Sequence, residues 1–223
     1  MSVRAALANN PLNRVLAKRS DLHILRKLWH MGSGSLCLFA YYQTGEHANL
    51  WGWAILAVAL GGFSVDIIRA RSEKLNALVI GLMGPFMRAS ERTGFTGFPF
   101  YALGVAIALL AFESRIALLA VMFLVYSDPI SSFFGILYGK DKIMPNKSLQ
   151  GAIACFFTCY LLTLFYGISY GAGGSSLLWF AILGGVVGAL GEMMSAFNID
   201  DNLTIPVVAG SGLTVLNYLF QVL

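Results

Sequence analysis

SDPISSFFGILYGKDKIMPNKSLQG, residues 127–151, places an aspartate and a proline inside an apolar run and then adds three lysines. The run extends from Ile116 to Tyr138. A carboxylate at membrane depth costs about 2.5–3.5 kcal/mol on insertion scales, so Asp128 requires a cation, a metal or water as partner. Pro129 lacks a backbone donor and is expected to break or kink the helix beside it. The stretch predicts either a polar pocket in a membrane bundle or a packing kink followed by a basic loop.

The second half of this stretch combines glycines with lysines. Glycine lets a backbone approach a ligand closely, and lysine side chains bind phosphate as mobile point charges. The residues concerned are Gly135, Gly139, Gly151, Lys140, Lys142 and Lys147. Their spacing is compatible with a phosphate-binding pocket.

The composition is that of a membrane protein. Hydrophobic residues make up 57% and charged residues 12% of the 223 residues, and the mean hydropathy is +0.72. Residues 1–27 contain basic residues but no long apolar core, which predicts a retained amphipathic segment on the membrane surface, with a solvated basic tail as the alternative. Residues 28–223 then form a single integral membrane catalytic domain. The net charge is +4, and the basic residues lie beside apolar runs. This position indicates that they interact with anionic lipid headgroups and not with nucleic acid.

Seven apolar runs are candidates to cross about 30 Å of hydrocarbon as helices. They are residues 28–42, 48–65, 97–112, 116–138, 149–170, 176–197 and 203–223. An eighth run, residues 75–87, is too short to cross comfortably and contains Gly81, Gly84 and Pro85. We therefore expect an all-α, multi-pass transmembrane bundle of about seven spans plus one re-entrant or interfacial segment.

The basic residues test this choice. If the N-terminus is inside and residues 75–87 do not cross, every Lys and Arg except Arg115 lies inside. A full crossing would place Arg88 and Arg92 outside and reverse everything that follows. The pattern predicts a cytoplasmic N-terminus and active site, with the C-terminus on the opposite side of a bacterial inner membrane or an ER-type membrane.

The same topology places the ionisable residues at the cytoplasmic ends of their segments. A transporter usually carries polar groups along a path through both leaflets, and the outer halves of these runs offer almost none. The distribution favours an enzyme that acts on a cytosolic solute and a membrane-dissolved partner. A small transporter is the non-enzyme alternative.

This set of residues can support phosphoryl transfer, which needs a divalent metal, cations around the phosphate and a group that orients the attacking hydroxyl. Mg²⁺ prefers one or two carboxylates together with phosphate and water oxygens. The predicted catalytic residues and metal ligands are Asp128, Glu192 and Asp201, with Asp200 as a less favoured neighbour. Which of them is the base stays open. Arg26 and Lys27 are expected to bind phosphate.

Several of the other polar residues also have a purely structural interpretation. Asp66 with Arg69, and Arg88 with Glu91, have the i,i+3 spacing of helix-surface ion pairs. His30 is a hydrogen-bonding residue at the interface or a base. Asn202 and Pro206 are a cap and first turn of the last span or part of a site. Asp128 and Glu192 differ, since their cost in the membrane makes function the default.

The motifs resemble the signature of the CTP-dependent lipid kinases, which include the yeast-type diacylglycerol kinase, dolichol kinase and phytol kinase and are related to phosphatidate cytidylyltransferase. The resemblance covers roughly residues 26–206. The core of the signature is Asp128-Pro129, Gly135, Gly139-Lys140 and Pro145 to Ser148 followed by Gly151; further pieces, in order, are Arg26-Lys27 with His30, Asp66 with Arg69, Met87-Arg88 with Glu91, and Glu192 with Asp201 to Pro206.

This resemblance implies CTP as phosphoryl donor and a membrane alcohol as acceptor. It places Arg26, Lys27, Asp128 and Gly135 at matching positions of the nucleotide-transfer motif. The predicted nucleotide-binding residues are Arg26, Lys27, Gly135, Lys140, Lys147, Ser148 and Asn202. The segments around Met87 and Asp201 look more like the diacylglycerol kinases, which make phosphatidic acid, with polyprenol, dolichol or phytol as alternative acceptors. The histidine- and glycine-rich signature of true cytidylyltransferases is missing, so the resemblance favours transfer of the γ-phosphate over transfer of CMP. The oligomeric state stays open.

Overall fold

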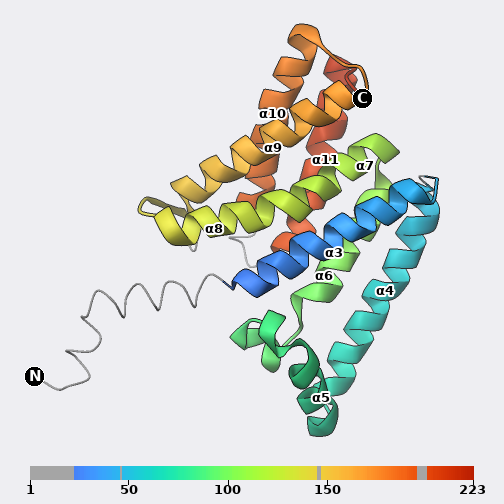
Figure 1. Cartoon of the computed structure of the whole chain (residues 1–223), viewed down its shortest axis with the longest axis vertical. Helices are drawn as coiled ribbons and strands as arrows, with labels where there is room; N and C mark the ends of the chain where they lie inside the picture. Colours follow the sequence, from blue (N-terminus) through green and yellow to red (C-terminus); the bar gives the residue numbers. More distant parts are fainter. Residues whose placement is uncertain (1–22, 46, 145–146, 195–199) are drawn as a thin grey trace, which may run out of the picture.

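The computed structural model describes residues 23–45, 47–144, 147–194 and 200–223 (Figure 1). Most of the predicted N-terminal amphipathic segment, residues 1–22, lies outside the described residues. The elements are α3 (Ile24–Gln43), α4 (Ala48–Arg69), α5 (Glu73–Met83), η1 (Gly84–Phe86), η2 (Ala89–Arg92), α6 (Gly97–Ala111), α7 (Ser114–Met122), η3 (Phe123–Ser127), α8 (Asp128–Tyr138), β1 (Lys142–Met144), β2 (Lys147–Ser148), α9 (Leu149–Ser169), α10 (Gly174–Met194) and α11 (Asp201–Phe220).

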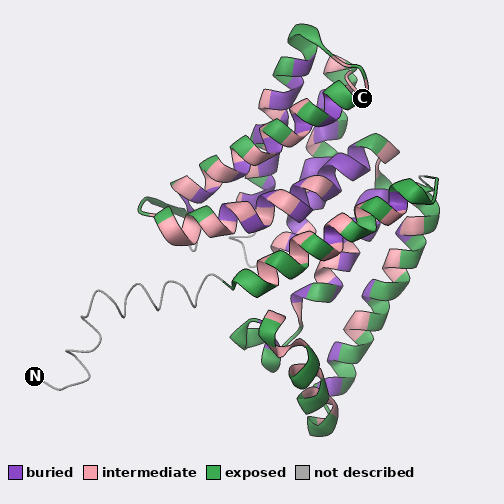
Figure 2. Cartoon of the chain, viewed as in Figure 1, coloured by how far each residue is buried: buried purple, intermediate pink, exposed green. Residues whose placement is uncertain are grey.

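The stretch that carries Asp128 lies at the centre of the bundle. Elements α7, η3 and α8 form one helix from Ser114 to Tyr138, and 67% of its most apolar window is buried, against 17% for α4. Phe123 and Leu124 are fully buried within it. Figure 2 shows the buried residues concentrated on α7 and its neighbours. The chain is organised around this helix because α6, α9 and α11 all pack against it.

The helix continues through Pro129, so of the expected break or kink the break does not occur. The five residues before Asp128 adopt a π-helical turn, η3, which accommodates the proline in the first turn of α8. In that register the carbonyl of Leu124 would pair with the N–H of residue 129, which proline lacks. Nε2 of His30 donates to this carbonyl at 3.1 Å. His30 therefore has the structural role, because it satisfies a backbone acceptor that the proline leaves open.

Each of the seven predicted spans contains a helix, but within the described residues five helices are long and apolar enough to cross a membrane: α4, Ser114–Tyr138, α9, α10 and α11. Helix α6 has only 15 residues. The protein is thus a helical multi-pass membrane protein. One small departure from the all-α prediction is an antiparallel pairing of β1 with β2 in the lysine-rich loop.

The segment between α4 and α6 leaves and re-enters the bundle at one end. Nε of Arg69 donates to Oδ1 of Asp66 at 2.7 Å, and Arg69 also donates to the backbone carbonyls of Glu91 and Gly94. Oδ2 of Asp66 accepts from the backbone N–H of Thr96 at 2.8 Å. Helix α5, with 11 residues, spans only about 16 Å. This geometry favours a short segment that does not cross.

Cysteine labelling tests that topology. In a background that lacks Cys37, Cys155 and Cys159, single cysteines at Ser72 and Ser90 should react with an impermeant maleimide from the same side of the membrane. A cysteine at Ser175, in the first turn of α10, should react from the other side. Labelling of Ser72 and Ser90 from opposite sides would show that residues 75–87 cross, and would separate the residues that we place in one site.

Candidate active site

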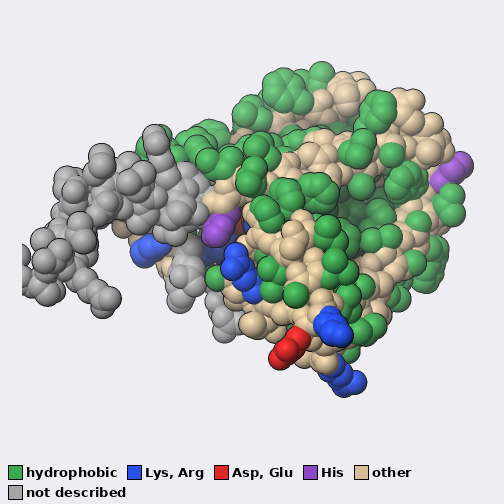
Figure 3. All heavy atoms as spheres, turned by 60° about the horizontal axis from the view of Figure 1, so that its bottom comes forward, with side chains coloured by type: hydrophobic (Ala, Val, Ile, Leu, Met, Phe, Trp, Pro, Cys, Tyr) green, Lys and Arg blue, Asp and Glu red, His purple; other side chains and the backbone are tan. Residues whose placement is uncertain are grey.

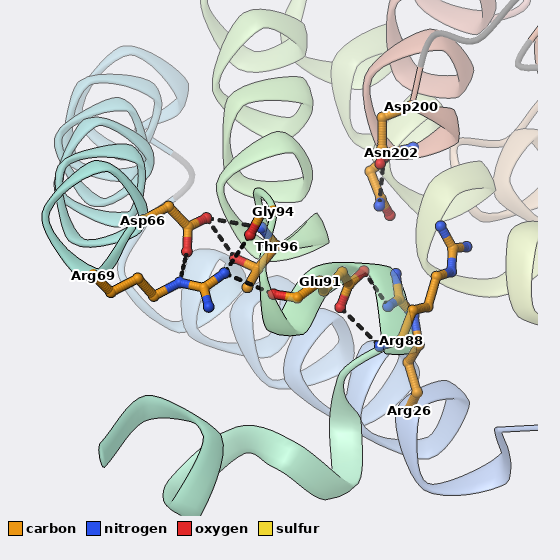
Figure 4. Close-up of polar contacts among 9 residues, drawn as sticks. All are labelled: Arg26, Asp66, Arg69, Arg88, Glu91, Gly94, Thr96, Asp200 and Asn202. Carbon is orange, nitrogen blue, oxygen red and sulfur yellow. Dashed lines mark hydrogen bonds and ion pairs between the residues drawn. The ribbon is translucent and has the colours of Figure 1, made fainter. Parts of the chain in front are cut away.

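One end of the bundle gathers most of the predicted site residues, which come from helix termini that are distant in sequence. Arg26 and Lys27 are in the first turn of α3, and Arg88 and Glu91 lie at η2. Figure 4 shows Arg26, Arg88 and Glu91 beside one another, near the Asp200–Asn202 segment. Figure 3 shows Lys and Arg side chains on this face, with hydrophobic side chains over much of the rest. The predicted clustering of charge at one end is present in the fold.

At this end of the bundle, the carboxylates of Asp128 and Asp201 are available to bind a ligand. Among the residues that the structure describes, neither side chain accepts a hydrogen bond or forms an ion pair, although the two are close enough to interact electrostatically. Lys27 and Arg88 also interact electrostatically with Asp128. Asp201 opens α11, where the helix dipole favours a negative charge. Both carboxylates thus have oxygens available for a ligand.

The negative charge of these carboxylates affects the pKa of Arg88. Burial by itself works to lower the pKa of Arg88, but the carboxylates of Asp201, Asp128 and Glu91 raise it, and the net direction is upward. Arg88 therefore stays charged beside the open carboxylates. Sequence spacing suggested an ion pair between the side chains of Arg88 and Glu91. Instead, Oε2 of Glu91 accepts from the backbone N–H of Arg88 at 3.0 Å and caps η2.

Glu91 also binds Arg26. Nη1 of Arg26 lies 2.5 Å from Oε1 of Glu91, and the pair joins the start of α3 to η2 across 65 positions of sequence. Arg26 is thereby held with part of its guanidinium in a carboxylate contact. An arginine has five donors, so it can keep this contact and still donate to a phosphate.

Glu192 is buried near the end of α10 and is already engaged. It accepts from Nζ of Lys147 at 2.6 Å and from Oγ of Ser131 at 2.8 Å. Within the described part of the chain, no three His, Cys, Asp or Glu side chains are close enough to hold a metal. The predicted three-carboxylate metal cluster is therefore not gathered. Asp128 and Asp201 remain, and two carboxylates with phosphate and water oxygens suit Mg²⁺.

Asn202 and Asp200 cap the last helix. Oδ1 of Asp200 accepts from both the backbone N–H and Nδ2 of Asn202, at 3.0 and 2.7 Å. Burial and the neighbouring Asp201 raise the pKa of Asp200, while the two hydrogen bonds from Asn202 act in the opposite direction. The less favoured neighbour predicted from sequence thus serves as the N-cap of α11, and Asp201 is the more available carboxylate.

Gly135 and Ser148 lie in a helix contact. A Cβ placed on Gly135 would meet Oγ of Ser148 and Cα of Gly151 at 3.3 and 3.7 Å. Oγ of Ser148 in turn accepts from the backbone N–H of Gly151 and caps α9. Lys140 is exposed, and its backbone N–H donates to Oε1 of Gln150 at 3.1 Å. These residues hold the lysine-bearing hairpin against α8 and α9.

Sequence reasoning missed a cavity of about 500 Å³ beside this cluster. Arg26, His30, Glu91 and Asn202 line its charged end, and Trp29 and Phe98 belong to its apolar wall. The lining comes from α3, α4, α5, η1, η2, α6 and α11, so no local periodicity could have indicated it. The site therefore has an apolar chamber next to its charged end.

The match to known proteins assigns the class. Residues 19–197 match the model of the cytidylyltransferase family, and the chain belongs to that family. The chain is 35% identical to CTP-dependent diacylglycerol kinase 1 of Schizosaccharomyces pombe over 83% of this chain and 89% of that protein. It is 32% identical to CTP-dependent diacylglycerol kinase 1 of Saccharomyces cerevisiae, over 83% of this chain and 70% of that protein. No solved structure matches the chain significantly. The resemblance to the CTP-dependent lipid kinases is confirmed.

Proposed function

We propose that this protein is a CTP-dependent diacylglycerol kinase, which transfers the γ-phosphate of CTP to the free hydroxyl of diacylglycerol and yields phosphatidic acid and CDP. The observation that carries this proposal is the 35% identity to a diacylglycerol kinase that uses CTP, over most of both chains. The charged cluster, which comprises Arg26, Lys27, Arg88, Asp128 and Asp201, and the adjoining apolar chamber support this proposal, because the reaction joins a polar nucleotide to a membrane lipid. Polyprenol, dolichol and phytol remain the alternative acceptors.

The residues of the candidate site would have different roles in phosphoryl transfer. Arg26, Lys27 and Lys147 would bind and orient the phosphates of CTP, with Arg88 offsetting charge near the carboxylates. Asp128 and Asp201 would hold a divalent cation, which would offset the negative charge of the phosphates when it is bound. One of these two carboxylates would also accept the proton of the attacking hydroxyl. Glu192 positions Lys147, since the two form a partly buried ion pair.

The orientation in the membrane belongs to the same proposal. We place the N-terminus and the charged cluster on the cytoplasmic side, with seven crossings that leave the C-terminus opposite, in a bacterial inner membrane or an ER-type membrane. The basic residues support this arrangement, because almost all of them precede or follow spans on that side. CTP would then reach the site directly from the cytosol.

A labelling assay tests the function. Purified protein in mixed micelles should transfer label from γ-labelled CTP to diacylglycerol in the presence of Mg²⁺, and should do so poorly with ATP. Phytol, dolichol and other polyprenols serve as competing acceptors in parallel reactions. A lack of lipid-bound label with every nucleotide and acceptor would refute the kinase, and a preference for ATP would refute the donor.

Lys147→Ala should mainly raise the KM for CTP, by about tenfold, because the lysine contacts nucleotide phosphate in the ground state and the transition state alike. Steady-state kinetics with varied CTP measure this effect. Lys74→Ala, which removes an exposed lysine of α5, is the matched control and should leave KM unchanged. A loss confined to kcat would contradict the binding role of Lys147.

A further inference from the structure

We infer that the cavity between α3, α4 and α6 binds diacylglycerol, with an acyl chain in its inner part and an ester carbonyl hydrogen-bonded to Tyr101. This inference rests on the proposed function and names the place and the chemistry of its lipid acceptor. Tyr101 would then be a specificity residue that separates acyl esters from alcohols that lack an ester.

The cavity exists because α3 stands away from its neighbours. Helix α3 makes its main contacts with η1, η3 and α8, and it meets α4 and α6 mostly through single side chains, as where the ring of His30 contacts that of Tyr101. Beyond the outer chamber of about 500 Å³ lies an inner chamber of about 310 Å³. Both chambers are lined by Ser33, Phe98 and Tyr101, so they adjoin. Each volume lies within the range of about 300–1,000 Å³ that is typical of ligand sites.

The polarity of the two chambers matches an amphiphile. The outer chamber reaches the charged cluster through Arg26, Glu91 and Asn202. The inner chamber is lined almost entirely by apolar groups, among them Leu38, Ile55 and Val105. A lipid whose hydroxyl lies at the charged end would therefore place its hydrocarbon in the inner chamber, where burial of each CH₂ group is favourable.

Two buried polar atoms in the lining have no partner among the described residues, and both fit groups of diacylglycerol. The Tyr101 hydroxyl has no hydrogen-bond partner and lies against Gly34, which lines the inner chamber. It can donate to an ester carbonyl. Oδ1 of Asn202 is also unpaired, and its orientation is fixed because Nδ2 must donate to the carboxylate of Asp200. It can accept from the free hydroxyl of the lipid.

These two atoms distinguish the candidate acceptors. Diacylglycerol has a hydroxyl, ester carbonyls and acyl chains, so it can satisfy Asn202 and Tyr101 and also fill the inner chamber. Phytol, dolichol and other polyprenols have a hydroxyl and hydrocarbon but no carbonyl, so the Tyr101 hydroxyl would stay unpaired. Leaving such a buried group unsatisfied is unfavourable, which predicts weaker use of these alcohols.

Matched substrates test the role of Tyr101. Wild-type protein should use a diacylglycerol about tenfold better, in kcat/KM, than a dialkylglycerol of equal chain length, in which ether groups replace the esters. Tyr101→Phe keeps the ring and removes only the unpaired hydroxyl, so it should fold. The variant should lose about tenfold on the diester, keep its activity on the diether and bring the ratio close to one. An equal loss on both lipids, or no preference in the wild type, would overturn the assignment.

Cysteine labelling tests the cavity without relying on catalysis. Cys37 lines the inner chamber and is exposed, whereas Cys155 and Cys159 are fully buried, so a maleimide should react selectively at Cys37 in detergent. Long-chain diacylglycerol should slow this reaction severalfold and dioctanoylglycerol should slow it less; Cys37→Ala is the control for selectivity. An unchanged rate would place the lipid elsewhere even if the kinase assay succeeds. Protection without any phosphoryl transfer would instead refute the function and keep the lipid site.

Discussion

We expect Asp128→Asn to lower kcat by at least about 100-fold while the protein remains inserted and folded. Asparagine keeps the shape of the side chain but removes the charge that a metal or a developing positive charge requires, and one such electrostatic contact is worth roughly 2.7–4 kcal/mol in the transition state. The folded state should not suffer, because the carboxylate has no hydrogen bond or ion pair within the described chain and its charge is costly in the membrane.

The measurement is kcat for CTP-dependent phosphorylation, together with thermal unfolding in detergent. Asp141→Asn is the matched control, since Asp141 is exposed in the hairpin loop and its carboxylate accepts from Gln150. The control should keep wild-type turnover. Normal turnover in Asp128→Asn would remove Asp128 from the site, and a fall in unfolding temperature that parallels the loss of activity would make its role structural.

Asp66→Asn should have the opposite effect, a loss of stability of about 3–5 kcal/mol, with an unchanged KM for CTP in the protein that remains folded. Asp66 and Arg69 form an ion pair in which both side chains are almost completely buried, with exposed fractions of 4% and 2%. Removal of the carboxylate charge leaves the guanidinium buried without its counter-charge. The same guanidinium ties the end of α4 to the backbone before α6, so the loss should loosen that end of the bundle.

Thermal unfolding monitored by size-exclusion fluorescence measures this loss, and Ser64→Ala on the exposed face of α4 is the control. The two Asp→Asn variants form a pair, since one should lose turnover and the other stability. If Asp66→Asn unfolds normally but raises the KM for CTP, the buried ion pair belongs to the nucleotide site, and our separation of structural from catalytic carboxylates is wrong.

Local patterns predicted the helices well, because apolar runs in a membrane protein have few alternatives to helix. The runs at residues 48–65 and 149–170 correspond to α4 and α9 with small shifts at their ends. The i,i+3 spacing of Asp66 and Arg69 also predicted a true contact. Each of these inferences depends only on residues that are close in sequence.

Contacts between distant residues were beyond such patterns. Nothing in the sequence indicates that His30 supplies the donor for Leu124, because that need arises only once Pro129 has imposed a π-helical turn. The packing of Gly135 on Gly151 likewise depends on how α8 meets α9, and it gives these glycines a structural reason that the sequence left open.

The sequence predicted which residues belong to the candidate site better than it predicted how they are arranged. Charge at one end of the bundle followed from the positive-inside rule, which needs no coordinates. The rule does not indicate which side chains pair with one another: Glu192 binds Lys147, and Arg26 binds Glu91. The apolar cavity depends on the separation of α3 from α4 and α6, a property of packing that no single helix encodes.

Doubly labelled CTP tests the central claim most directly, because the family includes proteins that transfer CMP. Purified protein is incubated with diacylglycerol, and separately with phosphatidate, using CTP that carries one label on the γ-phosphate and a different label on the cytidine. We predict that the γ-label appears in phosphatidic acid, that the cytidine label stays in water-soluble CDP, and that phosphatidate accepts neither. Cytidine label in the lipid fraction, with release of pyrophosphate, would show a cytidylyltransferase and contradict the kinase.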